Sequence, residues 1–425
     1  MDYPWRDLYT WRPFKIDALG IITLLGSEEI DAWVGRLVPS RWLEYMPLLA
    51  INVVATNQFL RKQPSFFLYN VTKGIHTTDM AAWFTRWIQC QQLEPTRTVI
   101  CWEEQTQTSN QRMYYHLISA GISFCSTGFL VVLTVLSHDF YGLATACALI
   151  VSILARAYLL NANRSAIDRA IIQQSLSPSS SQNQASRNKI LIITPDSNIL
   201  TMYVPGNLII PVFIRNPIPS SPKLYDMFCW VAWAAFCVQV ITLGMAVLAT
   251  QMYVVLLITM PSMLICRGFG CDDTVRPCEV KSERYGRVKG YTCQIGSRLK
   301  ATVFEWPECM EFANTDLGWG LRGPSTDTEL MLGRSTKRMD LFAWLNLTDE
   351  EEESMSRWDL LPHQRGDDST WQDNFKAKRS LVRETQMDIW DVQKVVVGAI
   401  RDGRNAVRDC ENGAAFPSGE PKVYC

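Results

Sequence analysis

The sequence lacks an excess of charge of either sign. Its 425 residues contain 41 Lys and Arg against 42 Asp and Glu, a formal net charge of −1. A protein whose main partner is bulk nucleic acid usually carries a basic stripe, so the balance argues against nucleic acid as a partner. The chain is 20% charged and 48% hydrophobic, which also excludes a protein that is disordered throughout.

Common nucleotide-binding and catalytic motifs are missing as well. Neither a phosphate-binding G-x-x-x-x-G-K-[ST] nor a G-x-S-x-G nucleophile elbow occurs. The string Gly318–Gly323 satisfies G-x-G-x-x-G, but no apolar strand leads into it and Pro324 follows where a cofactor helix would begin. We expect a tight loop at this string and no bound cofactor.

Charged side chains are absent from several long stretches of the chain. Leu117–Leu136 is a run of twenty residues without one, and Phe140–Ala155 continues the run after a polar turn at 137–139. Met227–Cys266 is a second block, forty residues long. A helix needs about 20 apolar residues, each adding about 1.5 Å, to cross the hydrocarbon core of a bilayer. Each block therefore predicts one helical hairpin.

The predicted fold class is an α-helical membrane protein with four spans. We place hairpin 1 in residues 113–160 and hairpin 2 in residues 227–266, with the second turn between Gly244 and Gln251. The alternative is a set of helices buried in a large soluble core, which the length of the uncharged runs disfavours. Ion-coupled transporters usually carry ionisable residues on their path, so these spans argue against transport by a monomer.

The flanks of the predicted spans indicate their orientation. Lys and Arg lie before and after each hairpin, whereas the two hairpin turns contain none. Short loops rich in Lys and Arg stay on the cytosolic side of a membrane. We therefore expect the N-terminus, the middle segment and the C-terminus to lie in the cytosol, at a membrane that the sequence does not identify.

The residues outside the hairpins predict mixed secondary structure. Residues 1–112 form an N-terminal helical region, with helices expected over 28–38, 41–60 and 79–93. Residues 161–226 combine a Ser-rich linker with three β-rich runs, 189–194, 199–204 and 208–214, which predict a small β meander.

Residues 267–425 predict an α+β domain that is mainly helical. Val288–Ile295 and Arg298–Trp306 are expected to pair as a hairpin. Thr348 and Glu351 have the spacing of a capping box at the start of a helix. Two further helices are expected over 371–384 and 387–408.

Four cysteines after the last span are the weak candidates for a metal or disulfide site: Cys271, Cys278, Cys293 and Cys309. Their spacings of 7, 15 and 16 residues do not match the close pairs of a zinc knuckle, so no structural metal is expected. In the cytosol they would be reduced, whereas the inverted orientation would make them candidates for two disulfides.

Two short sites that contain acidic residues are weak candidates for a catalytic role. His138 and Asp139 occupy the turn of hairpin 1, where the histidine could respond to pH, although a plain polar turn is the more economical interpretation. Asp272 and Asp273 follow the last span without a second acidic cluster at a defined spacing. Glycosylation sequons occur at three asparagines, which the predicted topology leaves unused: Asn70, Asn163 and Asn346.

Several short stretches resemble a large group of uncharacterised multi-pass membrane proteins of filamentous fungi. The stretches, within positions 110–410, are Arg164–Asp168 (RSAID), Thr194–Gly206 (TPDSNILTMYVPG), Ile295–Leu299 (IGSRL), Asp316–Gly318 and a helix-rich tail ending near Trp358–Pro362. The resemblance implies a fungal integral membrane protein and supplies no activity, substrate or catalytic residue.

Two classes of function are open at this point. The first is a non-catalytic membrane anchor whose partners are the lipid bilayer and other proteins. The alternative is a membrane-embedded accessory enzyme acting on an apolar metabolite, for which the resemblance suggests fungal secondary metabolism. Its candidate residues would be His138, Asp139, Asp272 and Asp273. An oligomeric channel is a third, weaker hypothesis.

Overall fold

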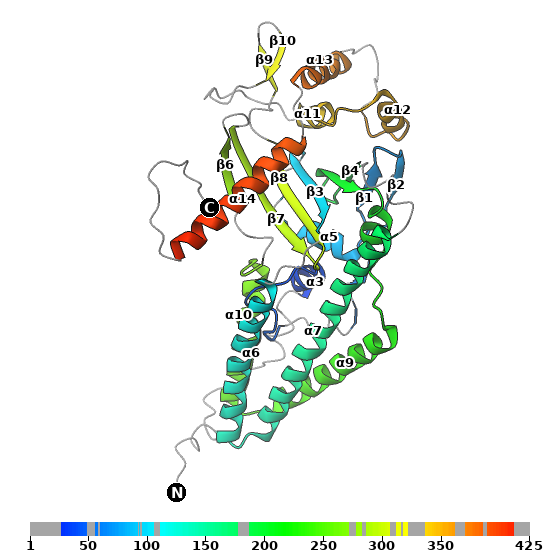
Figure 1. Cartoon of the computed structure of the whole chain (residues 1–425). Helices are drawn as coiled ribbons and strands as arrows, with labels where there is room; N and C mark the ends of the chain where they lie inside the picture. The colour runs from blue at the N-terminus through cyan, green and yellow to red at the C-terminus, as the bar shows by residue number, and fades with distance from the viewer. Residues whose placement is uncertain are drawn as a thin grey trace.

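The protein is described from a computed structural model. The structure describes residues 27–48, 56–57, 60–91, 93, 96–105, 111–176, 187–271, 278–282, 286–306, 312–315, 318–321, 336–361, 370–385 and 389–411. These residues form an elongated molecule with a helical bundle at one end and a sheet covered by helices at the other (Figure 1).

Four long helices form the bundle, and each is long and apolar enough to cross a membrane. They are α6 (Gln111–Leu136), α7 (Phe140–Ser175), α9 (Pro222–Met245) and α10 (Leu248–Cys266). The four predicted apolar helices are confirmed, and short turns join them, since α6 and α7 are separated only by Ser137–Asp139, and α9 and α10 only by Ala246–Val247. We call the end with these two turns the turn end of the bundle and the opposite end the domain end.

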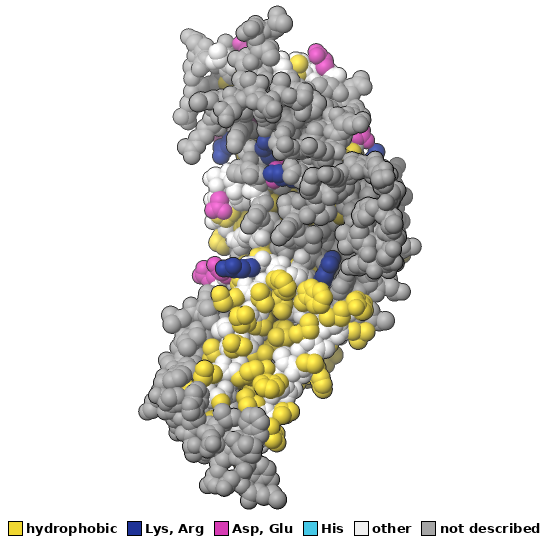
Figure 2. Space-filling model, turned by 90° about the vertical axis from the view of Figure 1, so that its left-hand side faces the viewer, with side chains coloured by type: hydrophobic (Ala, Val, Ile, Leu, Met, Phe, Trp, Pro, Cys, Tyr) yellow, Lys and Arg dark blue, Asp and Glu magenta, His cyan; other side chains and the backbone are white. Residues whose placement is uncertain are grey.

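The outer surface of the bundle is apolar. Phe124 on α6 is 78% exposed, Trp230 on α9 is 75% exposed and Leu154 on α7 is 60% exposed. Figure 2 shows a broad band of hydrophobic side chains on the face that contains α6 and α10, with Lys, Arg, Asp and Glu beginning above it. A continuous apolar surface of this size is unfavourable in water and is matched by the acyl chains of a bilayer.

α7 packs against α9, and α6 packs against both α7 and α10. Tyr158 of α7 stacks on Phe228 of α9 with ring centroids 4.1 Å apart. Tyr253 of α10 donates a hydrogen bond of 3.0 Å to the backbone carbonyl of Ser126 on α6. The α7–α9 pair leans away from the α6–α10 pair toward the domain end, so the bundle opens in that direction (Figure 1).

One sheet of eight strands lies beyond the domain end, in the order β2-β1-β4-β5-β3-β8-β7-β6. The strands are β1 (Phe67–Asn70), β2 (Ile75–Thr77), β3 (Thr98–Glu104), β4 (Arg187–Ile193), β5 (Ile199–Pro205), β6 (Cys278–Ser282), β7 (Gly286–Ile295) and β8 (Leu299–Glu305). β3 lies in the middle, parallel to β5 and antiparallel to β8, while the other neighbours are antiparallel. Segments before, between and after the hairpins thus share one sheet.

Three expectations about the soluble parts need correction. In the described part of residues 1–112, where helices were predicted, the strands β1, β2 and β3 stand beside the helices α3 (Ser27–Gly35) and α5 (Ala82–Gln89). The third predicted β run is a π-helical segment, η2 (Ile209–Ile214). The predicted helix 41–60 is not formed at its start, where residues 41–46 are turns and a bend. In each place tertiary partners replace the local pattern, as the contacts below show.

An aromatic core fills the sheet face nearer the bundle. Trp83, Phe84 and Trp87 of α5 meet Trp102 of β3 and Phe213 of η2, with ring centroids 4.9 to 6.1 Å apart. All five side chains are fully buried. The predicted apolar face of this helix is therefore core packing and not a surface that lies on the bilayer.

The opposite sheet face is covered by helices from the C-terminal region. They are α11 (Thr336–Trp344), α12 (Asp349–Arg357), α13 (Thr370–Thr385) and α14 (Ile389–Glu411). α14 crosses β6, β7 and β8 (Figure 1), and Val392 and Val396 of this helix are fully buried. The predicted β7–β8 pairing and the capping box of Thr348 and Glu351 are both confirmed. Gly318–Leu321 is strand β10, paired with β9 (Phe312–Thr315), and not a loop.

Candidate functional site

A buried polar cluster joins the bundle to the sheet. It is built on α7, which at 36 residues is about 54 Å long and extends past the roughly 30 Å hydrocarbon layer. Arg156, Arg164 and Asp168 follow one another at intervals of eight and four residues, so they share one face of α7. That face meets Glu44 of the N-terminal segment and the β7–β8 turn. We call these four residues and the turn the junction.

Glu44 and Arg164 form the centre of the junction. Arg164 Nη1 lies 2.6 Å from Glu44 Oε1, and Arg164 Nε donates to the backbone carbonyl of Leu37 at 2.8 Å. The second oxygen of Glu44 accepts the backbone N–H of Ser40 at 3.0 Å. Burial acts to raise the pKa of the Glu44 carboxyl, but Arg164, the Ser40 N–H and Arg156 outweigh it and hold the pKa below its usual value. Glu44 is therefore a buried carboxylate ion.

Arg156 holds backbone that is not helical. Its Nη2 donates to the carbonyls of Glu44 and Met46, at 2.8 and 2.5 Å. Unpaired carbonyls are costly next to a bilayer, where irregular backbone is tolerated only when protein groups satisfy it. The guanidinium replaces the hydrogen bonds that a helix over 41–60 would have made. Arg156 is buried and points into the protein, although it directly follows the uncharged run that ends at Ala155.

The serine stripe of α6 has the same role. Ser119 Oγ donates to the carbonyl of Trp42 at 3.1 Å, and Ser123 Oγ donates to that of Tyr45 at 2.6 Å. The stripe binds the N-terminal segment, which lies beside α6 near the domain end. The segment is thus held by hydroxyls from α6 and by an arginine from α7.

Asp168 fixes the sheet to α7. Its carboxylate accepts the backbone N–H and the hydroxyl of Ser297 at 2.8 Å, and the N–H of Arg298 at 3.1 Å. Gly296 has a φ of +61°, and a Cβ built there would lie 2.6 Å from Asp168 Oδ1. The tip of the β7–β8 turn therefore fits the carboxylate only with glycine at this position.

A second buried carboxylate lies at the turn end of the bundle. Asp139 Oδ1 accepts the N–H of Gly142 at 2.9 Å, which caps α7, and Oδ2 accepts the N–H of Val247 at 2.9 Å. Asp139 thus ties one hairpin turn to the other. His138 beside it is exposed, with a φ of +52°. Both oxygens of Asp139 are occupied by backbone donors, an arrangement typical of a structural carboxylate.

The four cysteines after the last span lie in separate parts of the structure where it describes them. Cys271 follows α10 and forms a β-bridge with Ser40, whereas Cys293 lies within β7 and is paired with Ala301 of β8. The backbone of Cys278 is in β6, opposite Gly290. Cys309, Asp272 and Asp273 lie outside the described residues. Within the described part of the chain, no three His, Cys, Asp or Glu side chains lie close enough to hold a metal ion.

The three sequon asparagines have structural partners. Asn70 is buried in β1 and accepts the N–H of Lys73 at 3.2 Å. Asn163 is buried within α7, where its Nδ2 donates to the carbonyl of Leu159 at 2.8 Å and to the hydroxyl of Tyr225 at 3.1 Å. Asn346 is exposed. A glycan on Asn163 would require α7 and α9 to separate.

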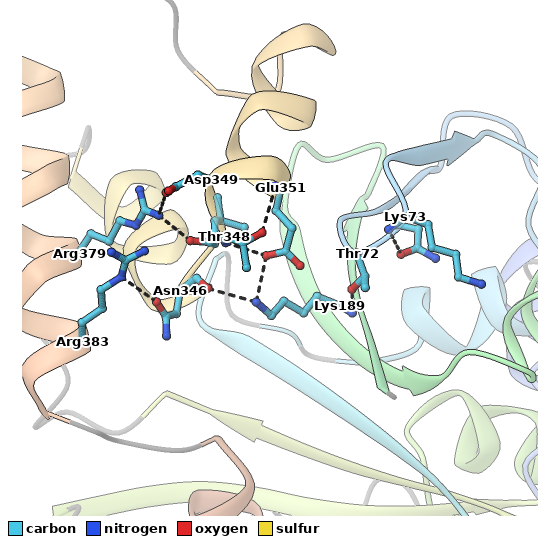
Figure 3. A network of polar contacts seen from close by, with 11 residues as sticks. Thr72, Lys73, Lys189, Asn346, Thr348, Asp349, Glu351, Arg379 and Arg383 are labelled. Atoms are coloured by element: carbon cyan, nitrogen blue, oxygen red, sulfur yellow. Dashed lines mark hydrogen bonds and ion pairs between the residues drawn. The ribbon is translucent and has the colours of Figure 1, made fainter. Parts of the chain in front are cut away.

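A further polar network attaches the C-terminal helices to the sheet (Figure 3). Lys189 of β4 donates to the carbonyl of Asn346 and to Glu351 Oε2, both at 3.2 Å. Glu351 also accepts the backbone N–H of Thr348 at 3.0 Å, so one carboxylate completes the capping box and binds the sheet. This network positions the start of α12 against β4.

Arginines of α13 extend the network on the other side of the same turn. Arg379 donates to the carbonyl of Leu347 at 2.7 Å and pairs with Asp349 at 3.0 Å. Arg383 donates to the side-chain oxygen of Asn346 at 3.4 Å. The cations of this network are paired with protein oxygens, which supports a role in packing the helices.

Sequence reasoning missed the junction. The arginines beside the predicted spans, Arg156 and Arg164 among them, were used only to predict orientation. Glu44 lies in the helix predicted over 41–60. Arg164 and Asp168 do lie in the stretch RSAID, and Gly296, Ser297 and Arg298 in the stretch IGSRL, but nothing in either stretch identifies the other as its partner. The signal that could have found them is the shared helical face of an Arg, an Arg and an Asp beyond the end of a span.

Comparisons of the chain with protein-family models, with curated proteins and with solved structures find no match. The resemblance to fungal membrane proteins therefore gains no support from them. The four helices that could span a membrane, together with the geometry of the junction, are the findings from which a function has to be argued.

Proposed function

We propose that this protein is a non-catalytic, four-span membrane anchor that holds an α/β domain in a fixed position at the cytosolic face, where the domain binds other proteins. The observation that carries this proposal is the junction. One uninterrupted helix, α7, leaves the bundle and is bonded to both the N-terminal segment and the β7–β8 turn. A flexible tether would not need buried charges at this point.

The cytosolic placement rests on the distribution of basic residues. Arg164, Arg169, Arg215, Lys223 and Arg267 all lie at the domain end or in the domain, and the two hairpin turns carry no Lys or Arg. Because the positive-inside rule counts such short flanks, it favours the domain in the cytosol and the two turns on the far side.

A topology measurement tests this placement. A protease-cleavable tag at the C-terminus and a glycosylation acceptor inserted after His138 would be followed in sealed membrane vesicles. We expect the tag to be digested from outside cytosol-facing vesicles and the inserted acceptor to be glycosylated. A protected tag with an unglycosylated acceptor would overturn the orientation.

Identification of neighbouring proteins tests the second half of the proposal, that the domain binds other proteins. A proximity-labelling enzyme fused to the C-terminus would mark neighbouring proteins, in the wild type and in an Asp168→Ala variant of equal abundance. If the domain is held in a fixed position, the wild type should label a reproducible set of neighbouring proteins. The variant should label only part of that set. An identical set in both proteins would argue that the junction has no part in presenting the domain.

A further inference from the structure

The connection between η2 and α9 presents an apolar tip among basic residues. Ile218 is 77% exposed and Leu224 is 48% exposed. Arg215 and Lys223 are exposed on either side of Ile218, and Arg169 of α7 is half-buried beside it. We call these five residues the basic shoulder. Contiguous groups of large exposed aliphatic side chains are unusual on a protein surface that faces water. The position of this group relative to the bundle and its basic neighbours therefore indicates what it contacts.

The basic shoulder is held in place from inside the protein. Asn216 accepts the N–H of Ala82 at 2.7 Å and donates to the carbonyl of Leu60 at 2.8 Å. Arg169 Nη2 lies 3.5 Å from the carbonyl of Ile218. The side chain of Asn216 and the carbonyl of Ile218 are thus bonded to the protein, so the exposure of the Ile218 side chain belongs to the folded conformation.

The packing of α7 on α9 sets the height of the basic shoulder relative to the apolar band of the bundle. Thr145 is bonded to Thr242 and Asn163 to Tyr225, which defines an antiparallel register. Continuing this register by two residues places Lys223 beside Ser165, about one helical turn from Arg169. The uncharged surface of α9 begins at Met227, directly below. The basic shoulder therefore lies at the boundary between the apolar band and the domain.

Among the described residues, no ion pair involves Arg169, Arg215 or Lys223. Of the nearby acids, Asp168 is bonded to the β7–β8 turn and Asp226 is exposed. Three cations against one exposed acid leave a positive surface where phospholipid headgroups would lie.

We propose that the basic shoulder is a binding site for the headgroup of an anionic phospholipid. The two guanidinium groups and the ammonium of Lys223 would bind the phosphate and carboxylate oxygens, since arginine forms paired hydrogen bonds with such groups. Ile218 and Leu224 would insert at the level of the first acyl carbons. The inference rests on the anchoring half of the proposed function and does not depend on which proteins the domain binds.

Binding of short-chain phosphatidylserine to the full-length protein in neutral detergent tests the proposal. Native mass spectrometry would give the dissociation constant, with short-chain phosphatidylcholine as the uncharged comparison. Each cation near a membrane surface contributes about fivefold to the affinity for anionic lipid, so the variant R169Q/R215Q/K223Q should bind about a hundredfold more weakly. The matched control R338Q/R357Q/K394Q removes three exposed cations from the C-terminal helices and should bind like the wild type.

Each outcome of this experiment decides the proposal. Weaker binding in the first variant alone, with phosphatidylserine preferred over phosphatidylcholine, supports the site. Equal loss in both variants, no loss in either, or equal binding of the two lipids overturns it. Should the triple variant unfold, K223Q alone changes an exposed side chain and should still lose about fivefold. Detergent removes the orientation of the protein, so an inverted topology would contradict the proposed function without affecting this result.

Discussion

The carboxylate of Asp168 accepts both the backbone N–H and the hydroxyl of Ser297, at 2.8 Å, although the two residues are 129 positions apart. Asp168 belongs to the helix that rises from the bundle, and Ser297 belongs to the turn between β8, the neighbour of β3, and β7. This pair connects the bundle of four apolar helices directly to the sheet. It also explains why α7 continues as one helix beyond the length that a bilayer requires.

Replacing Asp168 with alanine should loosen the domain from the bundle. The change removes the acceptor for Ser297 and Arg298, and hydrogen bonds to a charged group are worth about 2 kcal/mol. We expect a clear fall in the melting temperature of the protein in detergent. Asp391→Ala is the matched control, because it removes a partly exposed acid paired with the exposed Lys394 and should change stability by less than about 0.5 kcal/mol. Equal effects of the two changes would contradict the assignment.

Gly296 and Gly398 offer a second matched pair. Gly296→Ala forces a side chain into a left-handed backbone conformation and against Asp168, whose Oδ1 would lie 2.6 Å from the new Cβ. It should destabilise the protein by about 1 to 2 kcal/mol. Gly398 lies within α14 with open space around its Cβ position. Gly398→Ala should therefore stabilise the protein by about 0.5 to 1 kcal/mol, as usual for glycine inside a helix. Thermal unfolding of the two variants should show shifts of opposite sign.

Asp139→Ala should separate the two hairpin turns. The helix cap of α7 is lost, at about 1 kcal/mol, and the buried N–H of Val247 is left without its acceptor, at about 1 to 3 kcal/mol. His138→Asn changes the neighbouring residue, and asparagine tolerates the positive φ, so a shift below about 0.5 kcal/mol is expected. Melting temperatures of the two variants provide the check. An unchanged melting temperature of the Asp139→Ala variant would mean that the hydrogen bonds of Asp139 contribute nothing to stability.

The ion pair of Glu44 predicts a pH dependence of stability. In the folded protein the pKa of Glu44 lies below its ordinary value of 4.5. The stabilisation that it provides is therefore complete above about pH 4.5 and is lost as the pH falls through the lower, folded-state pKa. Glu44→Gln has no such titration. The difference in melting temperature between the wild type and this variant should be large at pH 7 and shrink below pH 4.5.

An exposed glutamate serves as the control for that titration. Glu353 is 66% exposed and pairs with Arg357 on the same helix, so Glu353→Gln should differ little from the wild type at any pH. A constant difference between wild type and Glu44→Gln from pH 7 down to pH 3 would contradict the role given to the Glu44 carboxylate.

Local patterns were sufficient for the elements that contain their own signals. The uncharged runs 117–136 and 227–266 place the spans, because a helix in a bilayer satisfies its backbone internally and needs only apolar length. Thr348 and Glu351 cap α12 with groups three residues apart. The hairpin of β7 and β8 needs only a short turn between two strands. Each of these features is decided within one stretch of chain.

Features that depend on distant partners were not predictable in the same way. Residues 209–214 read as a strand, but Phe213 is buried among the aromatics of α5, and the carbonyl of Val212 accepts the indole N–H of Trp83. Residues 41–46 read as a helix start, but their carbonyls are bound by Ser119, Ser123 and Arg156. The helix predicted over 79–93 begins only at Ala82, because the backbone N–H groups of Ala81 and Ala82 donate to Phe213 and Asn216.

The sequence by itself thus determined four apolar helices long enough to cross a membrane, the short turns between them, the β7–β8 pairing and the capped start of α12. Those follow from composition and short-range spacing, which act over a few helical turns. The tertiary structure decided that strands from before, between and after the hairpins share one sheet, and that Glu44, Arg156, Arg164 and Asp168 meet where it joins the bundle. Such pairings depend on which buried charges and backbone groups find partners across more than a hundred residues, and no local pattern encodes that choice.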